Sequence, residues 1–236
     1  MNVLVVGNGT MGTLVYHKLI EQNDSVTIAP DLKLDVCGDF DVIIDFSHPE
    51  GLDAIVKFAR EADVPVVIAT TGYSEAQVDQ IKTLAGEVPV LYSGNYSLGI
   101  ILMNRLIREA ARVLGADFDI EIIEKHHHHK VDAPSGTAKM LLAAANEKLG
   151  HNVIYGREGF SKRKVNEIAV HTVRGGSIVG EHEVLFAGAD EVFSMKHEAL
   201  SKSIFVNGAI KGALWLQDMP IGLYSMEDVL FGEDSE

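Results

Sequence analysis

The chain has 236 residues, of which 47% are hydrophobic and 23% charged, a composition typical of a globular protein and not of a disordered or fibrous one. Its formal net charge of −14 is spread along the chain. This argues against a nucleic-acid binder, which needs concentrated Lys and Arg, so an anionic ligand must be bound locally by helix N-termini, backbone N–H groups and a few cations.

Cysteine content and the apolar segments indicate the compartment. The only cysteine, Cys37, cannot form an intrachain disulfide, which favours a reducing environment. The first residues, MNVLVVGNG, run directly into an apolar segment, so we expect no signal peptide. No stretch of about 18 uninterrupted apolar residues occurs, so we expect no membrane span. Together these features predict a cytoplasmic protein.

The first part of the chain alternates short apolar strands with amphipathic segments of helix length. Such alternation is typical of a parallel sheet with right-handed crossovers. The expected strands are NVLVV (2–6), SVTIA (25–29), DVIIDF (41–46), VPVVIAT (64–70) and VPVLYSG (88–94). The expected helices are MGTLVYHKLIEQ (11–22), PEGLDAIVKFAREA (49–62) and SEAQVDQIKTLA (74–85).

The pattern changes near residue 96. A helix is expected at 98–114, a half-buried strand at 118–127, and another helix from the PSGTA turn. Three long alternating runs then follow, joined by short Gly-bearing turns, which favours antiparallel strands. These runs are KVNEIAVHTV (164–173), SIVGEHEVLFA (177–187) and DEVFSMKHEA (190–199), and the last long segment, 201–218, has helical periodicity.

These elements predict an α/β fold with two domains. Residues 1–96 together with 205–236 are expected to form a dinucleotide-binding domain around a Rossmann-like parallel sheet. Residues 97–204 are expected to form an α+β domain with a mixed, largely antiparallel sheet. The final helix would pack back on the first domain, so the second domain would be an insertion.

A glycine-rich turn follows the first strand. The sequence GNGTMG, with Gly7, Asn8, Gly9, Thr10, Met11 and Gly12, fits G-x-G-x-x-G between a strand and a helix. In this motif the first glycine allows a tight turn, the second lets a pyrophosphate approach the backbone, and the third permits close helix packing. The turn therefore predicts a nicotinamide dinucleotide, against the alternative of a plain turn.

The residue that would read the nucleotide ribose is less clear. Asp31 is the nearest acid at the end of the second strand, but Lys33 is close enough to contact a 2′-phosphate instead, and Asp31 alone could be a solvated loop residue. NADH and NADPH both stay open. Two further turns at strand ends can line the nicotinamide half of the site or be ordinary turns: Ala69, Thr70, Thr71 and Gly72, and then Ser93, Gly94, Asn95 and Tyr96.

Four consecutive histidines lie in the segment EKHHHHKVDAPSGTA, 124–138. A purification-tag remnant would be terminal and longer. A metal site would need converging ligands, yet adjacent residues of a strand point to opposite faces, and no Cys or HExxH partner is nearby, so we expect no metal. A catalytic segment explains more: Lys130 supplies a cation and the PSGTA turn opens a helix, which makes an anion pocket beside a group that titrates near neutral pH.

This segment closely resembles the signature E-x-H-H-x-x-K-x-D-A-P-S-G-T-A of the dihydrodipicolinate reductase family of lysine and diaminopimelate biosynthesis. The resemblance extends over nearly the whole chain, through GNGTMG, IDFSHPEG, ATTG, SGNYSLG, VRGGSIVGEHEVLFAG and FVNGAIKGALWL. It implies an enzyme that reduces 4-hydroxy-tetrahydrodipicolinate, a cyclic imine dicarboxylate, to tetrahydrodipicolinate with loss of water and with NADH or NADPH as the reductant. It also implies a homotetramer, with residues 97–204 as the domain for substrate binding and oligomerisation.

Residue roles follow from the resemblance. The family's proton donor and acceptor falls on His126 and its second acid on Lys130, while His127, Gly136 and Thr137 fall where the family binds substrate carboxylates. His128 and His129 fall on variable positions. The second-strand terminus lacks a clear acid or Arg, which puts the cofactor preference in doubt, and we expect both cofactors to be used.

Other residues have two interpretations each. Glu124 can orient His126 or be a solvated carboxylate, and Arg174 can cap the substrate pocket. His171, His182 and His197 can be core, interface or functional histidines. A cofactor-binding sensor without turnover would not need His126, Lys130 and the PSGTA turn. A dehydrogenase acting on an aldehyde would need a nucleophile, and Cys37 is not placed for that role.

Overall fold

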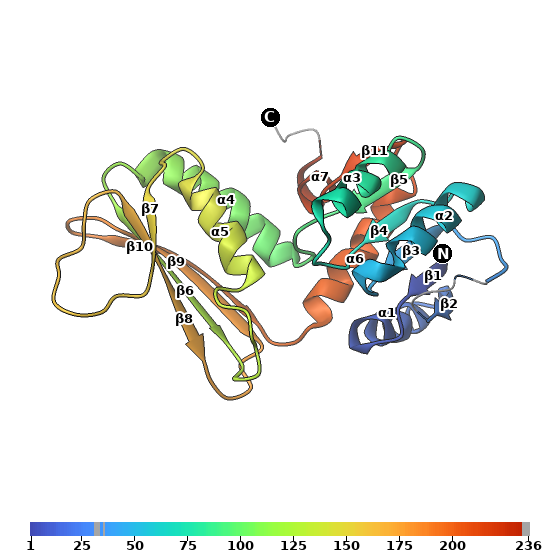
Figure 1. Ribbon diagram of the computed structural model, residues 1–236, viewed down its shortest axis with the longest axis horizontal. Coiled ribbons are helices and arrows are strands. Elements are labelled where there is room, and N and C mark those ends of the chain that lie inside the picture. Colours follow the sequence, from blue (N-terminus) through green and yellow to red (C-terminus); the bar gives the residue numbers. More distant parts are fainter. Residues whose placement is uncertain (31–33, 35, 233–236) are drawn as a thin grey trace. The chain divides into compact units, whose positions relative to one another are not determined.

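The computed structural model describes residues 1–30, 34 and 36–232 and divides into two compact units (Figure 1). One unit contains Met1–Leu98 and the C-terminal segment that starts at Ser203, and the other contains Gly99–Lys202. The expected boundary near residue 96 and the return of the chain near residue 205 lie close to these limits. Each unit has its own sheet and its own core.

The first unit contains a six-stranded sheet whose paired strands are all parallel, in the order β11-β5-β4-β3-β1-β2. The strands are β1 (Asn2–Val6), β2 (Ser25–Ala29), β3 (Val42–Asp45), β4 (Val66–Ile68), β5 (Pro89–Tyr92) and β11 (Gly222–Tyr224). The central strands β1, β3 and β4 are short β-branched runs buried on both faces, as is typical of parallel sheets, whereas the edge strands β2 and β11 are partly exposed. Strand β11 extends the predicted sheet by one strand at its edge.

Helices cover both faces of this sheet. Helices α2 and α3 pack over Leu4, Ile43 and Ile68, whereas α1 and α6 lie together on the opposite face. The helical elements of the unit are α1 (Thr10–Glu21), η1 (Pro49–Gly51), α2 (Leu52–Ala62), α3 (Glu75–Leu84), α6 (Ser203–Leu216) and α7 (Met226–Phe231). The predicted return of the last long helix to the first part of the chain is thus observed, because α6 contacts β3, β4 and β5.

The second unit contains a mixed five-stranded sheet in the order β10-β9-β6-β8-β7. Strand β6 pairs in parallel with β8 and antiparallel with β9. One face of the sheet is covered by two helices, which enclose a core that includes Ile120, Ile122 and Phe186. The elements are α4 (Leu98–Leu114), β6 (Asp119–His126), α5 (Gly136–Asn146), β7 (Asn152–Tyr155), β8 (Glu167–Arg174), β9 (Gly180–Ala187) and β10 (Val192–Ala199).

The α/β fold class and the mixed second sheet are confirmed, but that sheet is not largely antiparallel, since β6–β8 and β7–β8 pair in parallel. The strand order also differs from the expected one. The alternating runs of β8 and β9 suggested an antiparallel pair, but β6 lies between them. Residues 175–179 therefore cross the end of β6, where the Gly175 N–H donates to the His126 carbonyl oxygen over 2.9 Å. Five residues suffice because the crossing spans only two strand spacings of about 4.8 Å each. The crossing brings this segment beside His126.

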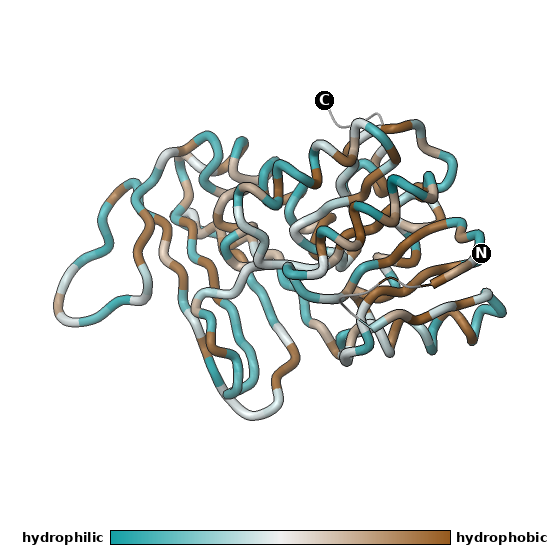
Figure 2. The backbone as a smooth tube through the Cα atoms, turned by 45° about the vertical axis from the view of Figure 1, so that its right-hand side comes forward, coloured by the Kyte–Doolittle hydropathy of each residue, from teal (hydrophilic) through white to brown (hydrophobic). Residues whose placement is uncertain are grey.

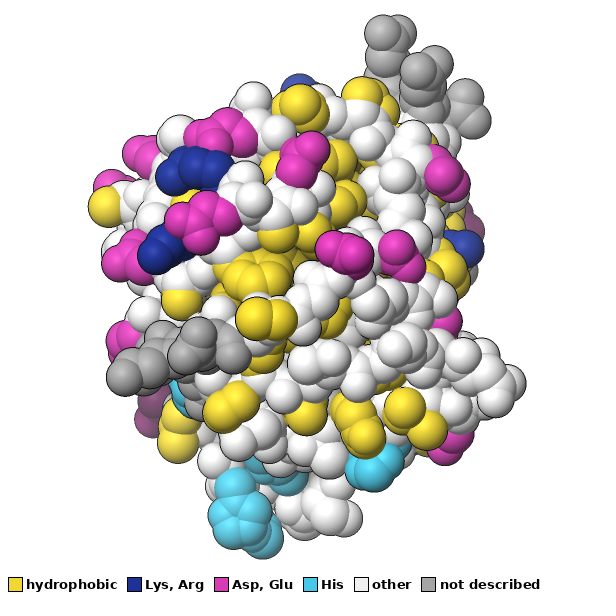
Figure 3. Space-filling model, turned by 90° about the vertical axis from the view of Figure 1, so that its right-hand side faces the viewer, with side chains coloured by type: hydrophobic (Ala, Val, Ile, Leu, Met, Phe, Trp, Pro, Cys, Tyr) yellow, Lys and Arg dark blue, Asp and Glu magenta, His cyan; other side chains and the backbone are white. Residues whose placement is uncertain are grey.

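Surface and hydropathy agree with the composition. Figure 2 shows hydrophobic residues along the strands, while the helices alternate between hydrophobic and hydrophilic residues. Figure 3 shows more acidic than basic side chains on the face that it presents, in keeping with the net charge of −14. None of the helices in the described ranges is long and apolar enough to span a bilayer.

Candidate active site

The three glycines of the first turn have different surroundings. Gly7 has φ +102°, and a Cβ there would clash with the Phe46 carbonyl oxygen at the end of β3. A Cβ on Gly12 would clash with the Gly7 carbonyl oxygen, because α1 approaches the turn closely. A Cβ on Gly9 would meet nothing within 4 Å. Gly7 and Gly12 are thus required by the fold, whereas Gly9 leaves open space.

This turn fits a dinucleotide pyrophosphate. Helix α1 begins at Thr10, with Gly9 as its N-cap, and no side chain caps the helix start. The first N–H groups of a helix lack intrahelical partners and attract an anion. Asn8 and Met11 lie within the same turn, and the Asn8 carbonyl oxygen accepts a hydrogen bond from the Thr13 hydroxyl over 3.2 Å. Asp31 lies outside the described residues.

The neighbouring strands end in a polar network that the sequence analysis did not single out. Asp45, the last residue of β3, is fully buried, and burial raises the pKa of its carboxyl group. It accepts hydrogen bonds from the Ser47 N–H (3.0 Å), the Ser47 hydroxyl (2.5 Å) and the Tyr73 hydroxyl (3.2 Å). Thr70 joins the network by accepting from the Ser47 N–H over 2.8 Å. The sequence feature that could have indicated this network is an acidic residue, Asp45, at the end of the apolar run DVIID.

The two other predicted cofactor turns lie at the same carboxyl edge of the sheet. Ala69 extends the pairing of β4 through its N–H to the Asp45 carbonyl oxygen, and Gly72 has φ +88°. The Tyr96 hydroxyl is buried and donates towards the Ile68 and Leu91 carbonyl oxygens. Tyr96 thus secures the loop from inside the fold, and the more exposed members of the two turns are Thr71, Gly72, Ser93 and Gly94.

In the second unit, His126 ends β6 and is only 8% exposed. Its Nδ1 lies 2.5 Å from a carboxylate oxygen of Glu124. The two side chains meet because residues two apart on a strand point to the same face. A carboxylate on Nδ1 holds the proton there and directs Nε2 away from Glu124, as in other carboxylate–histidine pairs.

Glu124 is fully buried and accepts hydrogen bonds from β6, from β8 and from the residue that caps α5. Besides His126, it accepts hydrogen bonds from the Ser135 N–H (3.0 Å), the Thr172 hydroxyl (3.3 Å) and both terminal nitrogens of Arg174 (2.8 and 2.9 Å). Burial raises the pKa of this carboxyl group, but the donors from Arg174, His126 and Ser135 outweigh burial and hold it below its ordinary value. Glu124 is therefore ionised, and the solvated alternative is wrong.

Helix α5 is fixed to the same carboxylate. The Ser135 hydroxyl caps the helix by accepting from the Ala138 N–H over 3.1 Å, and it lies 3.0 Å from His182 Nε2. Burial lowers the pKa of His182 to about 4, so this imidazole is neutral at pH 7. Its ring lies 5.1 Å from that of His126. A Cβ on Gly136 would meet nothing within 4 Å, so the helix start carrying Gly136 and Thr137 borders open space.

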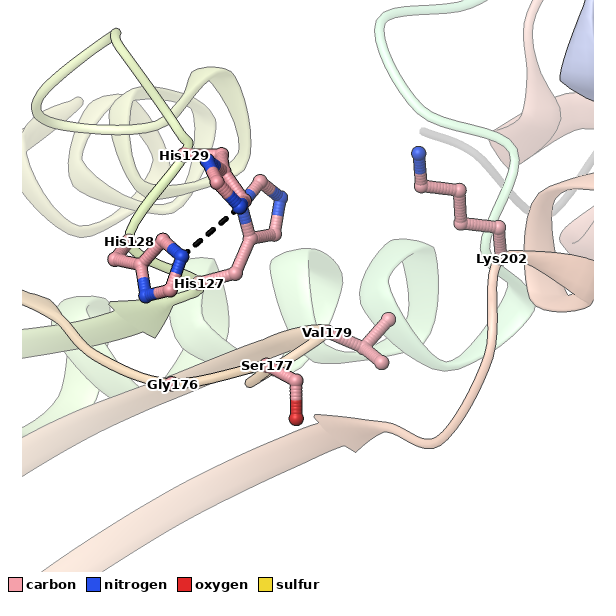
Figure 4. Close-up of a pocket in the computed structure, with 7 residues that line it drawn as sticks. All are labelled: His127, His128, His129, Gly176, Ser177, Val179 and Lys202. Carbon is pink, nitrogen blue, oxygen red and sulfur yellow. Dashed lines mark hydrogen bonds between the residues drawn. The ribbon is translucent and has the colours of Figure 1, made fainter.

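The residues after His126 line a hollow of about 460 Å³ (Figure 4). The lining consists of His127, His128, His129, Gly176, Ser177, Val179 and Lys202. The Nε2 atoms of His128 and His129 lie 2.9 Å apart. Lys130 does not line the hollow, and its ammonium pairs with Asp132 over 2.7 Å. Within residues 1–30, 34 and 36–232, no three His, Cys, Asp or Glu side chains are grouped to hold a metal ion.

The structure thus brings His126, Arg174 and the start of α5 together through Glu124. Arg174 also donates to the Asp132 carbonyl oxygen over 2.6 Å, which ties down the loop that carries Lys130. His171 belongs to another cluster, since it contacts Glu121 over 2.7 Å and Glu121 points to the other face of the sheet. Lys202 was missed by sequence reasoning, because nothing near it in the chain signals a site.

A parallel nucleotide-binding sheet with a glycine-rich turn, joined to an α+β unit with a buried carboxylate–histidine pair, defines a two-domain oxidoreductase of the nicotinamide-dependent class. Family models described as dihydrodipicolinate reductase, N-terminus and C-terminus, match residues 22–96 and 99–230. The chain belongs to the dihydrodipicolinate reductase family.

Individual relatives agree with this assignment. A 4-hydroxy-tetrahydrodipicolinate reductase from Clostridium tetani is 39% identical over 98% of this chain and 97% of its own length. One from Brachyspira hyodysenteriae is 42% identical over 98% of this chain and 100% of its own. The solved structure of a dipicolinate-bound dihydrodipicolinate reductase from Paenisporosarcina sp. TG-14 has the same fold, with a TM-score of 0.74 and 23% identity over 95% of this chain and 97% of that one.

Proposed function

We propose that this chain reduces 4-hydroxy-tetrahydrodipicolinate to tetrahydrodipicolinate with loss of water, a reaction of lysine and diaminopimelate biosynthesis. The observation that carries the proposal is the buried Glu124–His126 pair, held beside the start of α5 in a chain that belongs to this family. The pair offers a proton-transfer group, and the helix start offers N–H groups for a carboxylate.

The reductant is a nicotinamide cofactor, which supplies a hydride when it is bound. The turn from Gly7 to Gly12 would hold its pyrophosphate, because Gly9 leaves open space before the uncapped start of α1. The exposed residues of the turns at 69–72 and 93–96 would line the nicotinamide half of the site. We propose that both NADH and NADPH are used, since the sequence after β2 offers Asp31 for a ribose hydroxyl and Lys33 for a 2′-phosphate.

His126 is the proposed proton donor and acceptor. Glu124 holds its Nδ1, so Nε2 is the nitrogen available to the substrate. A Cβ on Gly180 would lie 3.1 Å from this Nε2, so a glycine at that position keeps the approach to the imidazole open. Lys130 is the proposed second acid, and its pairing with Asp132 would have to give way when the substrate binds.

Substrate carboxylates are the proposed ligands of His127, Gly136 and Thr137. The N–H groups at the start of α5 and the imidazole of His127 suit a carboxylate in a protein whose overall charge repels anions. The same donors also stabilise the electron-rich ring that forms as hydride adds to the imine.

We further propose a cytoplasmic homotetramer. The face of the second sheet that α4 and α5 do not cover carries Ile123, Val173 and Leu185, which alternate along their strands with the helix-covered residues. Val173 is 42% exposed in the single chain. The same face also carries the ion-paired side chains of Glu121 and Glu181, so a partner subunit would cover a surface of mixed apolar and charged residues.

Coupled turnover tests the function directly. The substrate is generated by condensing pyruvate with aspartate semialdehyde, and oxidation of NADH and of NADPH is followed separately after this protein is added. Oxidation that needs both substrate and protein is the expected result, and the ratio of the two rates gives the cofactor preference. Binding of both cofactors without oxidation would instead favour a redox sensor.

A further inference from the structure

The hollow lined by the residues after His126 is also lined by Lys202, a basic residue to which the proposed function assigns no role. Lys202 lies on one side of it and His127 on the other, with Val179 between them (Figure 4). The remaining wall comes from the crossing segment 175–179, through Gly176 and Ser177. Gly176 has φ +50°, and a Cβ there would meet no atom within 4 Å, so the segment turns sharply without filling the space.

The ionisable residues that line the hollow are all basic. Its lining contains three histidines and one lysine but no acidic residue. The Lys202 ammonium forms no ion pair within 4.0 Å with a carboxylate of the described residues, whereas Lys130 is paired with Asp132. The Nδ1 atom of His127 is buried without a hydrogen-bond partner. Burial, and then electrostatic interactions with His126, His129, Lys202 and Lys130, lower the pKa of His127.

A bound anion would provide a partner both for the Lys202 ammonium and for the His127 imidazole. A cation that lies across open space from a partly exposed imidazole with an unpartnered nitrogen is arranged to bind a group that accepts hydrogen bonds and carries negative charge. We propose that His127 and Lys202 bind one carboxylate of the substrate from opposite sides of this hollow, so that Lys202 is a substrate-binding residue. The start of α5 then takes the other carboxylate. This inference rests on the proposed function, which supplies a dicarboxylate substrate.

Lys202→Met tests the inference with dipicolinate, a planar dicarboxylate, as the competitive inhibitor. We expect its inhibition constant to rise roughly tenfold, which corresponds to about 1.4 kcal/mol, and KM for the substrate to rise similarly while kcat stays within about twofold, as for a contact made equally in ground and transition states. The ratio of the inhibition constant of picolinate, which lacks one carboxylate, to that of dipicolinate should fall by the same factor. Lys202→Arg should restore most of the binding.

Lys162→Met is the matched control, because Lys162 is an exposed lysine of the same unit that does not line the hollow. It removes the same charge and should leave the inhibition constant unchanged. Equal effects of the two lysine variants, or a dipicolinate constant in Lys202→Met within about twofold of the original, would overturn the inference. If the unmodified protein neither oxidises a nicotinamide with the substrate nor binds dipicolinate, the proposed function itself fails.

Discussion

Replacing Glu124 by Gln separates its role at His126 from its role in folding. The carboxylate accepts five hydrogen bonds, from His126, Ser135, Thr172 and both terminal nitrogens of Arg174. A Gln amide offers one oxygen in place of two, and its NH₂ group faces donors. Breaking a buried ion pair by removing one partner costs roughly 3–5 kcal/mol. Because the Arg174 side chain is 19% exposed, we expect a loss of about 3 kcal/mol in the free energy of unfolding.

The same change should lower kcat by roughly 10²-fold, because Nδ1 is no longer held by a charged acceptor and His126 loses its fixed orientation. Urea unfolding measures the first effect and steady-state turnover the second. The ¹⁵N shifts of the His126 ring report which nitrogen carries the proton. We expect the Nδ1–H form in the original protein and a mixture of the two forms in Glu124→Gln.

Glu121→Gln is the control for lost stability. Glu121 lies on the same strand but on the opposite face, where it contacts His171, Arg157 and Arg163. This variant should be destabilised while its kcat stays within about twofold of the original value. If Glu124→Gln also keeps its kcat while it loses stability, Glu124 has a structural role only and the reasoning is refuted.

Three further predictions concern other parts of the two units. Gly9→Ala should fold normally, since its Cβ meets open space, but should weaken NADH binding in a fluorescence titration by about tenfold or more. Gly12→Ala, whose Cβ would clash with backbone, should instead lose about 1–3 kcal/mol of stability or more in urea unfolding. The pKa of His182 is lowered to about 4 from 6.5, so its neutral form is stabilised by folding. The contribution of His182 to the free energy of unfolding is therefore complete above pH 6.5 and falls by about 3 kcal/mol as the pH drops to 4. Unfolding of His182→Gln at both pH values should show a weaker pH dependence, and an unchanged dependence would contradict the assignment. His126→Gln should cut kcat roughly 10²-fold, whereas His128→Gln, which alters an exposed ring, should change it little, and equal losses in turnover assays would point back to a metal.

The sheet of the first unit could be predicted almost completely. Its strands are continuous apolar runs separated by amphipathic helices, and right-handed crossovers leave few ways to connect them. In the second unit four of the five strands were predicted, whereas β7 and the order of the strands were not. The alternation of β8 and β9 shows that each has one buried face, but it does not show which strand is the neighbour, and β6 between them is a long-range choice.

The site divides in a similar way. The segment 124–138 predicts His126, Lys130 and the start of α5 as site residues, because they are close in sequence and share the pattern of a known family. The partners that orient them come from β8 and β9, about 50 residues further along: Arg174 on Glu124, and His182 on Ser135. Lys202 and the hollow that it shares with His127 come from still further along the chain.

What the sequence by itself determined is therefore the parallel sheet, the glycine turn and the histidine segment, since each depends on local periodicity or on residues adjacent in the chain. The tertiary structure alone decided which carboxylate is buried, how its charge is balanced and which nitrogen of His126 lies against that carboxylate. Those properties depend on burial and on donors brought together from separate strands, and neither burial nor long-range pairing can be read from a local pattern.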